Sequence, residues 1–422
     1  MVLVPGISPA MPGLTVGGLQ SERREYFPKL SEDDHDPLDD LEVCVRSGPV
    51  RVAIVGTGGI ARVHAAALVP GPGPGPGAAD QATEGHAAGA PEPATGVLVA
   101  AADIDGERLA AFAREHGVPA AYRDLDELLG EAKPDLVHIC TPPHVHCEQA
   151  LTCLRAGVSV LAEKPPVISL REFDLLTAAE GDAGPWFASV YQHRFGGAQR
   201  RLKGLVSDGA LGRPLLAMCH TTWFRDQGYF DVPWRGRWDT EGGGPTMGHG
   251  IHQMDMLLDV LGDWAEVRAI ARRQARRIRT EDLSLAHVTF ASGAVASVVN
   301  SVLSPREESY LRFDFERASV EVTHLYGYTD ESWRITPAPG WQVPSRVGGP
   351  GAASGHREQF AEVLACLAAG RRPPVAPAES RRTLSLVAGI YAAAFTGQPV
   401  TPADLGPSSS FYDRMDGGQA PW

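Results

Sequence analysis

At residues 52–61 the sequence reads VAIVGTGGIA, which joins four apolar residues to a glycine turn, and an Ala-rich segment follows to Leu68. This order predicts a buried strand, a tight turn and the start of a helix. Gly56 permits the turn, and Gly58 lets backbone N–H groups approach a pyrophosphate with no Cβ in the way. The helix N-terminus would then present unpaired amides and its positive dipole end to the phosphates. We therefore expect dinucleotide contacts from Gly56, Thr57, Gly58, Gly59, Ile60 and Ala61.

The composition excludes several classes of protein. A length of 422 residues suggests two or three domains. The net charge of −13 and a pI near 5.5 argue against a surface for nucleic acid or anionic membrane. No apolar run reaches the roughly 18–20 residues of a membrane span, and the N-terminus makes a poor signal peptide. Six cysteines in so long a chain do not form a disulfide framework, so we expect a cytoplasmic protein.

Two segments lack the pattern of a packed core. Residues 1–49 carry an acidic run and few periodic apolar positions, which predicts a flexible N-terminal extension. Residues 70–96 repeat Pro-Gly and hold no large apolar cluster, which predicts a disordered insert. The insert would connect a helix to the next strand, at the end of the sheet opposite the glycine turn.

The next strand, Val97–Ala102, ends in Asp103. Without the insert, Asp103 lies about 20 residues beyond the glycine turn, where an acidic residue takes the ribose hydroxyls of a dinucleotide. A carboxylate there repels a 2′-phosphate, and the neighbouring Ile104 offers no compensating cation, so NAD is favoured over NADP. The alternative is that Asp103 caps the helix expected over 107–116.

Further strands and helices alternate up to residue 166. Helices are expected over 124–130 and 143–156, and strands over 135–140 and 158–162, the last ending in Glu163-Lys164-Pro165. This alternation predicts an α/β fold with a doubly wound parallel sheet, which we assign to a Rossmann domain at 50–166.

The character of the chain changes after Pro166. A helix over 170–179 and a strand over 186–191 precede antiparallel signals from Leu215 onward. Strands over 283–290 and 295–302 flank a hairpin turn, as do strands over 310–315 and 319–323. Two helices with apolar positions at 360–367 and 384–395 close the chain. We expect an α+β domain at 167–422 with a large, mostly antiparallel open sheet.

Several motifs together resemble the glucose–fructose oxidoreductase / inositol dehydrogenase / MocA (Gfo/Idh/MocA) family. They are the glycine turn, Thr141-Pro142-Pro143-His144, Glu163-Lys164-Pro165, WRGRW at 234–238 and GGGPTMGHGIHQMD at 242–255. The resemblance covers about residues 50–400. It implies an NAD-dependent oxidoreductase, a cis Lys164–Pro165 bond, and a homodimer or homotetramer formed through the C-terminal sheet. It also implies cofactor contacts from Thr141, Pro142, His144, Glu163 and Lys164.

Lys164 follows a parallel strand at the carboxyl edge, where ligands of such sheets bind. A partly desolvated lysine there can act as a general acid or base, although an unplaced lysine is by default a surface residue. The resemblance places His252 at the substrate hydroxyl beside Lys164, with Asp255 as a binding or orienting carboxylate. Many members carry Asp four residues before this His, where the present chain has Gly248, and His249 could contribute in its place.

A helix beginning near Pro245 would align His249, His252, Asp255 and Asp259 on one face. A metal site from His249, His252 and Asp255 is the alternative, as is one within the segment 138–147. The first needs a further ligand and the second has no metal-ligand spacing, so we expect no metal.

The expected substrate wall combines aromatic and basic side chains. Aromatic faces stack on the C–H faces of sugars and Arg contacts hydroxyls, although such Trp residues are as often core packing. The candidates are Trp223, Trp234, Trp238, Arg225, Arg235 and Arg237, with Arg194 as a further contact.

The sequence thus predicts an NAD-dependent oxidoreductase that moves a hydride between nicotinamide and a hydroxyl carbon of a sugar, cyclitol or related polyol. Lys164 and His252 are the expected catalytic pair. Two alternatives are an NAD-dependent glycosidase or lyase with transient oxidation of the sugar, and a non-catalytic NAD-binding regulator. Neither nucleic acid nor membrane is expected as a partner.

Overall fold

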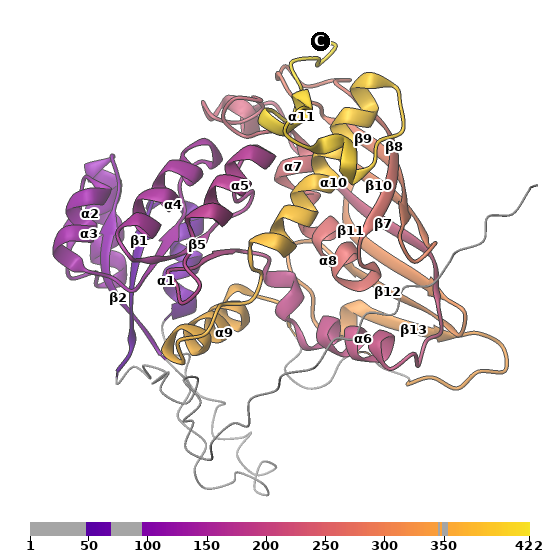
Figure 1. The fold of residues 1–422 in the computed structure, drawn as a ribbon, viewed down its shortest axis with the longest axis horizontal. Helices are drawn as coiled ribbons and strands as arrows, with labels where there is room; N and C mark the ends of the chain where they lie inside the picture. Colours follow the sequence, from indigo (N-terminus) through magenta and orange to yellow (C-terminus); the bar gives the residue numbers. More distant parts are fainter. Residues whose placement is uncertain (1–47, 69–94, 345–346, 348–352) are drawn as a thin grey trace, which may run out of the picture. The chain divides into compact units, whose positions relative to one another are not determined.

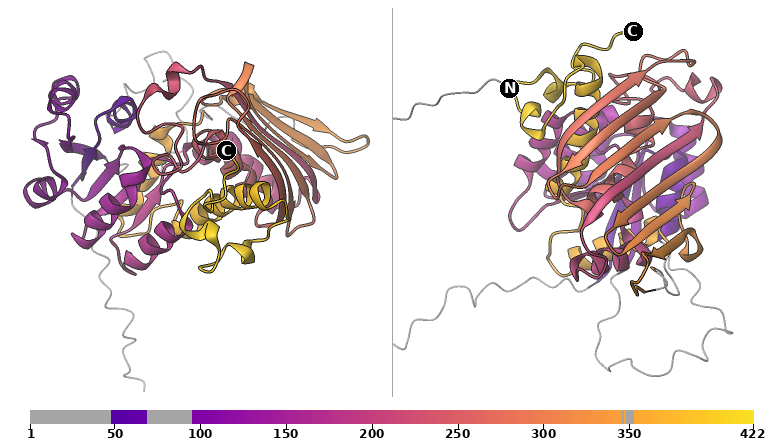
Figure 2. Two further views of the ribbon diagram at one scale, coloured as in Figure 1. Left: turned by 90° about the horizontal axis from the view of Figure 1, so that it is seen from above. Right: turned by 90° about the vertical axis from the view of Figure 1, so that its right-hand side faces the viewer.

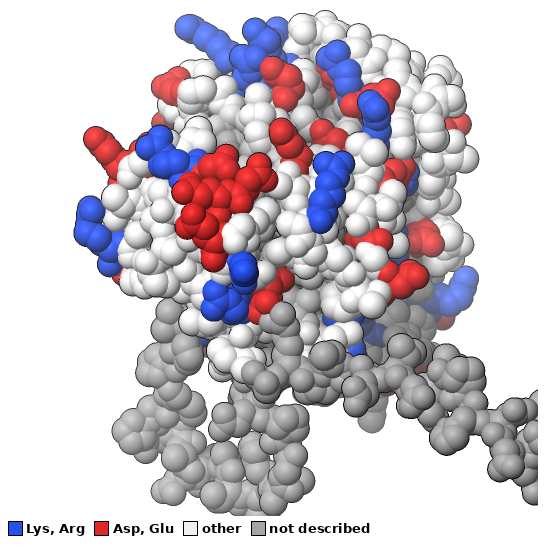
Figure 3. Space-filling view, turned by 60° about the vertical axis from the view of Figure 1, so that its left-hand side comes forward, with Lys and Arg blue, Asp and Glu red and all other residues white. Residues whose placement is uncertain are grey.

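The computed structural model describes residues 48–68, 95–344, 347 and 353–422. The expected N-terminal extension, apart from its last two residues, and nearly all of the expected insert lie outside these ranges. Among the described residues, no helix is both long and apolar enough to span a bilayer. On the face drawn in Figure 3, acidic side chains gather in one patch while basic ones are scattered. This distribution agrees with the negative net charge.

The first sheet contains six parallel strands in the order β3-β2-β1-β4-β5-β6, of which β1, β2 and β5 are labelled in Figure 1. The order reverses between β1 and β4, so a crevice opens there at the carboxyl ends of the strands, as in doubly wound folds. The α/β fold with a parallel sheet is confirmed. The strands are β1 (Val50–Val55), β2 (Gly96–Ala102), β3 (Ala121–Tyr122), β4 (Leu136–Ile139), β5 (Ser159–Ala162) and β6 (Phe187–Ser189).

The helices between these strands begin at polar caps. Asp105 accepts hydrogen bonds at the start of α2, and Asp124 and Ser169 do the same for α3 and α5. Each cap satisfies backbone N–H groups that the helix itself leaves unpaired. The capping role considered for Asp103 therefore belongs to Asp105. The helices are α1 (Gly59–Leu68), α2 (Gly106–His116), α3 (Leu125–Ala132), α4 (His146–Arg155, after the 3-10 turn η2, Pro143–Val145) and α5 (Leu170–Ala179).

Strand β6 extends the first sheet beyond Pro166. Its residues 187–189 pair in parallel with β5, and a 3-10 turn, η3 (Gln192–Phe195), then leads into α6 (Gly197–Ser207). The parallel sheet therefore continues past the residue at which the sequence changes character.

The second sheet has seven strands in the order β13-β12-β11-β7-β10-β9-β8. Only the β7–β10 pair in this sheet is parallel, so the expected mostly antiparallel sheet is confirmed. Helices lie against one face and leave the other uncovered (Figure 2). The strands are β7 (Pro214–Phe224), β8 (Trp264–Arg272), β9 (Leu283–Phe290), β10 (Val295–Ser301), β11 (Leu303–Phe315), β12 (Ala318–His324) and β13 (Trp333–Pro337).

The helix expected from Pro245 is broken in two. A short α7 (Pro245–Gly248) ends before α8 (Ile251–Leu261) begins. The break lies at His249 and Gly250, where an ideal Cβ on Gly250 would come within 1.9 Å of Asn300 Oδ1. The glycine is needed for this close approach to β10. Helix α8 is buried almost throughout, so its polar face is not a solvated surface.

The last helices return to both sheets. Helix α9 (His356–Ala368) packs its Phe360, Val363 and Leu364 into the same core as β1 and α1. Helix α10 (Pro377–Thr396) lies between α5, α8 and β8, and a short α11 (Ser410–Asp413) follows. The remaining 3-10 turns are η4 (Gly228–Asp231), η5 (Asp330–Ser332) and η6 (Pro402–Leu405).

Candidate functional site

A large cavity, of about 1730 Å³, opens at the carboxyl ends of β1, β4 and β5. Its lining comes from the glycine turn, the strand ends of the first sheet and the segments around η4 and α7. A pocket that holds a drug-sized molecule has roughly 300–1,000 Å³. The cavity therefore has room for a dinucleotide and a small second ligand together.

The glycine turn has the form that a pyrophosphate needs. Gly56 has a φ of +84°, and a Cβ there would lie 2.8 Å from the Cys140 backbone, so only glycine fits. A Cβ on Gly58 or Gly59 would instead meet no protein atom within 4 Å. Both glycines line the cavity at the N-terminus of α1, whose amides favour an anion. Thr57 and Ala61 are buried beneath the turn, while Ile60 lines the cavity.

Asp103 lies at the end of β2 and is tied to the glycine turn. Its carboxylate accepts hydrogen bonds from Thr57 N and Oγ1, at 2.7 and 2.8 Å. Arg108 also binds it with Nε and Nη2, at 2.9 and 2.6 Å. Although burial opposes ionisation, these hydrogen bonds hold the pKa of Asp103 below its ordinary value.

The expectation that Asp103 has no cation beside it is wrong. Arg108 lies in the first turn of α2 and reaches back to the carboxylate, which the residue next to Asp103 in the sequence could not reveal. Arg123, whose guanidinium binds the Ile104 carbonyl, lines the same end of the cavity.

Thr141, Pro142 and His144 line the cavity after β4, on the opposite side of the glycine turn from Asp103. Thr141 donates to Gln149 Oε1 at 2.7 Å, while the 3-10 turn η2 directs the chain into α4.

Lys164 extends from the end of β5 toward α7. The Lys164–Pro165 peptide bond is cis, as predicted. The amine donates a hydrogen bond to the Gly248 carbonyl at 3.1 Å. Burial lowers the pKa of Lys164, Glu163 and Glu241 oppose this effect, and Arg235 and Arg225 add to it. An amine with a lowered pKa can exchange protons closer to neutral pH.

Glu163 is held by a cluster of histidines beneath Lys164. His64 Nε2 and His356 Nε2 lie 2.9 and 3.4 Å from Glu163 Oε1. Burial disfavours the charged carboxylate, but the two imidazoles keep the pKa of Glu163 well below its usual range. His64 therefore donates from Nε2, and its Nδ1 lies 3.0 Å from His138 Nδ1 in a second hydrogen bond. The spacing of His64, Glu163 and His356 would also suit a metal ion, but these hydrogen bonds account for the arrangement.

His249 and His252 both line the cavity. His249 stands in the break before α8, stacked edge-on against Trp223 and close to Tyr229 Oη at 3.4 Å. Burial and the nearby Lys164 hold the pKa of His252 well below its ordinary value, which favours the neutral ring. Among the described residues no group bonds the Nδ1 atom of either ring.

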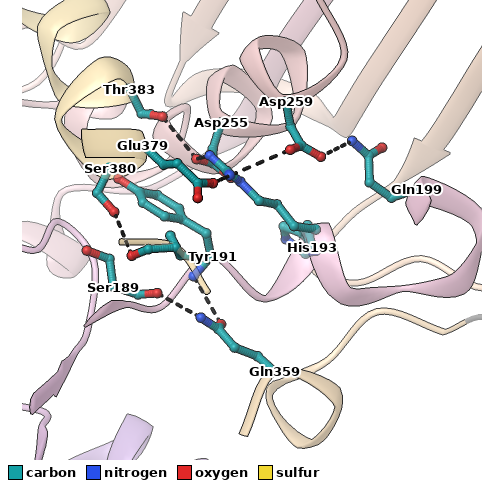
Figure 4. A network of polar contacts seen from close by, with 12 residues as sticks. Ser189, Tyr191, His193, Gln199, Asp255, Asp259, Gln359, Glu379, Ser380 and Thr383 are labelled. Carbon is teal, nitrogen blue, oxygen red and sulfur yellow. Dashed lines mark hydrogen bonds and ion pairs between the residues drawn. The ribbon is translucent and has the colours of Figure 1, made fainter. Parts of the chain in front are cut away.

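Asp255 and Arg194 do not line the cavity. They form a buried ion pair with two hydrogen bonds of 2.6 Å, and Thr383 donates to Asp255 at 2.9 Å (Figure 4). Glu379 and Asp259 complete the partners of Arg194. This network joins η3, α8 and α10 behind the cavity, so it can support His252 but does not face a ligand.

The expected aromatic wall is partly in place. Trp223, Trp234, Arg225, Arg235 and Arg237 line the cavity. Trp238 instead packs against Tyr391 and Phe395 in the core.

Two groups at the cavity were missed by sequence reasoning. Tyr229 lies between Arg235 and His249, and Glu241 is a buried carboxylate just before the glycine run. The position of Glu241 beside Gly242 was a signal that could have drawn attention to it. The histidines around Glu163 come from α1, β4 and α9, and only the fold brings them together.

Sequence profiles of two known family domains together match more than half of the chain. The profile of an oxidoreductase family with an NAD-binding Rossmann fold matches residues 50–189. That of the GFO/IDH/MocA C-terminal domain matches residues 199–323.

Individual proteins are similar to the same region. A 1,5-anhydro-D-fructose reductase of Ensifer adhaerens is 31% identical over 49% of this chain and 62% of its own length. A D-glucoside 3-dehydrogenase of Escherichia coli is 25% identical over 70% of this chain and 83% of its own. The WlbA dehydrogenase structure from Bordetella pertussis, in complex with NADH and UDP-GlcNAcA, superposes with a TM-score of 0.67 at 24% identity. It covers 84% of this chain and 98% of that one, and supports the fold.

The two glycines of the turn should respond differently to an added methyl group. Gly58→Ala should leave the thermal unfolding midpoint of the ligand-free protein unchanged, because its Cβ meets only open space. It should weaken NADH binding about tenfold or more by obstructing the pyrophosphate. Gly56→Ala should lower the unfolding midpoint itself. Calorimetric titration and thermal scans would test this, and unchanged NADH affinity in Gly58→Ala would place the pyrophosphate elsewhere.

Proposed function

Because the chain belongs to the Gfo/Idh/MocA family of oxidoreductases, we propose that it is an NAD-dependent dehydrogenase of a sugar, cyclitol or related polyol. The observation that carries the proposal is Lys164, which lines the same cavity as His252 and bonds the Gly248 carbonyl with its amine. Relatives named as acting on anhydrofructose, glucosides and myo-inositol support this class of substrate.

NAD would accept or return the hydride at its nicotinamide ring. The residues that would hold it are those of the glycine turn, Asp103, and the segment Thr141, Pro142 and His144. The open space at Gly58 and Gly59 fits the pyrophosphate, and Glu163 and Lys164 would lie at the nicotinamide end.

Lys164 would take the hydroxyl proton as the carbinol carbon is oxidised, and return it in the reverse direction. Its burial favours the neutral amine, which is the form that accepts the proton. His252 would hydrogen-bond the same oxygen through its ring. His249, Trp223, Trp234 and Arg235 would form the wall of the sugar site.

Asp255 and Arg194, which the sequence suggested as substrate contacts, would instead hold α8 in place. Trp238 would serve as core packing behind the wall.

The chain would be divided into two domains, one around each sheet, with α9 packed on the first sheet. We further propose a homodimer formed through the uncovered face of the second sheet. Apolar side chains on this face meet across strands, with Ile270 opposite Leu285 and Leu285 opposite Val299. Ile270 and Leu285 are 52% and 43% exposed. A contiguous row of exposed apolar side chains is unusual on a surface that remains in contact with water.

Substitution of the lysine tests the mechanism. A screen of sugars and cyclitols for NAD reduction should first identify a substrate of the wild-type protein. Lys164→Ala should then lower kcat by about 10²–10⁴-fold while NADH affinity stays nearly unchanged. Wild-type kcat/KM for oxidation should rise with pH as Lys164 loses its proton, and the variant should lack this rise.

Adding His252→Ala should make the lysine variant only slightly worse, since both groups act on one oxygen. A fully active Lys164→Ala enzyme would rule out the mechanism. Glycoside cleavage without net NADH would favour a glycosidase or lyase, and NADH binding with no turnover of any substrate would favour a regulator.

The cofactor preference should depend on Asp103 and Arg108 in opposite ways. NAD should bind more tightly than NADP, because Asp103 repels a 2′-phosphate. Arg108→Ala should increase this preference, since it removes the cation that offsets the carboxylate. Asp103→Ser should reduce the preference, because it frees Arg108 for the phosphate. Fluorescence titrations with NADH and NADPH would measure both, and equal affinity of the wild type for the two would contradict the proposal.

A charge on the uncovered sheet face should separate the dimer. Leu285→Asp should give a monomer in sedimentation experiments at micromolar concentration. This monomer should still be folded and should still show a cooperative thermal unfolding transition. Leu175→Asp, at a similarly exposed apolar residue on α5, is the matched control and should stay dimeric. A wild-type protein that sediments as a monomer would refute this interface.

A further inference from the structure

Gly248 has no side chain, but the space beside it is occupied by a carboxylate. An ideal Cβ on Gly248 would lie 3.3 Å from Glu241 Oε1, which is its one neighbour within 4 Å in the described part of the chain. A side chain at 248 would therefore contact Glu241 through its first carbon. The same residue 248 receives the Lys164 amine on its carbonyl oxygen. Glu241 thus reaches the backbone segment that holds the lysine.

The two oxygens of Glu241 have different surroundings. Oε2 accepts a hydrogen bond of 2.6 Å from the backbone N–H of Gly236, which fastens the loop that precedes it. Among the described residues, Oε1 receives only an ion-pair contact of 3.5 Å from Arg235. Glu241 lines the cavity although the residue is only 4% exposed. Oε2 therefore holds the loop through Gly236, and Oε1 can accept a further hydrogen bond.

The charges around Glu241 show why this capacity matters. Arg235 and Lys164 favour its ionised form, Glu281 disfavours it, and Tyr229 lies nearby. Burial is the largest effect and raises the pKa of Glu241 to about 7. A buried carboxylate that is this costly to ionise would be stabilised by a hydroxyl donor from a ligand.

We propose that Glu241 Oε1 is a substrate contact that accepts a hydrogen bond from a hydroxyl of the polyol, next to the group handled by Lys164. The inference rests on the proposed function and extends it, because it assigns a carboxylate to the side of the cavity where residue 248 has none. The geometry also means that positions 241 and 248 can supply a carboxylate to the same space, one at a time.

Glu241→Gln is the sharpest test, since the amide oxygen can still accept from Gly236 while an NH2 group replaces the oxygen facing the cavity. We expect an unchanged unfolding midpoint and unchanged NADH affinity. KM should rise and kcat/KM should fall by about 10–100-fold, as for loss of a hydrogen bond to a charged group. The probes are methyl β-D-glucoside, 1,5-anhydro-D-glucitol and myo-inositol, together with any faster substrate from the screen. Asp239→Asn removes an exposed carboxylate two residues away and should leave these values unchanged.

Relocating the carboxylate provides a second test. Gly248→Asp alone should lower activity and stability, because it forces two carboxylates together. The double variant Gly248→Asp/Glu241→Ala should have a kcat/KM at least tenfold higher than that of Glu241→Ala alone. A folded Glu241→Gln enzyme with wild-type kcat/KM, or a folded double variant no better than Glu241→Ala, would overturn the inference. A wild-type protein that oxidises no polyol would instead refute the proposed function.

Discussion

The hydrogen bond from the Lys164 amine to the Gly248 carbonyl is the contact on which the arrangement of the cavity depends. It ties the end of β5 in the first sheet to α7, which lies against the second sheet. A partly buried amine needs such partners, because desolvation disfavours its charged form. The glycines before α7 let the chain lie close to the backbone of residue 281. A Cβ on Gly244 would come within 2.0 Å of the Glu281 carbonyl oxygen. Backbone packing of α7 therefore helps to set the position of the Gly248 carbonyl that receives the amine.

Behind this contact, buried charges are organised as paired groups. Arg194 meets three carboxylates, and Glu163 meets two imidazoles. Such pairs contribute little net stability, since the cost of desolvating them roughly offsets their attraction. Their effect is to fix orientation: α8 is held with His252 toward the cavity, and Glu163 is held beneath Lys164. The side chain of Gln359 performs a similar task by bonding both Tyr191 N and the Ser189 carbonyl at the end of β6 (Figure 4).

The order and type of most elements could be predicted from the sequence, because period-two and helical patterns are local. The glycine turn, the strand ending at Lys164 and the hairpin of β9 and β10 were found this way. Contacts between distant segments could not be. Arg108 reaching back to Asp103, Gly250 packed against Asn300, and Glu241 beside Gly248 each depend on the folded chain. The family resemblance led us to expect Asp255 and Trp238 at the ligand, yet neither lines the cavity. Helical spacing says which residues share a face but not what that face meets.

The place of α9 has a consequence for how the chain is made. Its Phe360, Val363 and Leu364 complete the core over Val52 and Ile54, some three hundred positions earlier in the sequence. Each such side chain contributes about 1.5–3 kcal/mol on burial. During synthesis the first sheet emerges long before α9, with this apolar face still lacking its cover. The core of the first sheet is therefore completed late, although its strands are made early. Its apolar face stays uncovered in the nascent chain until the C-terminal region leaves the ribosome.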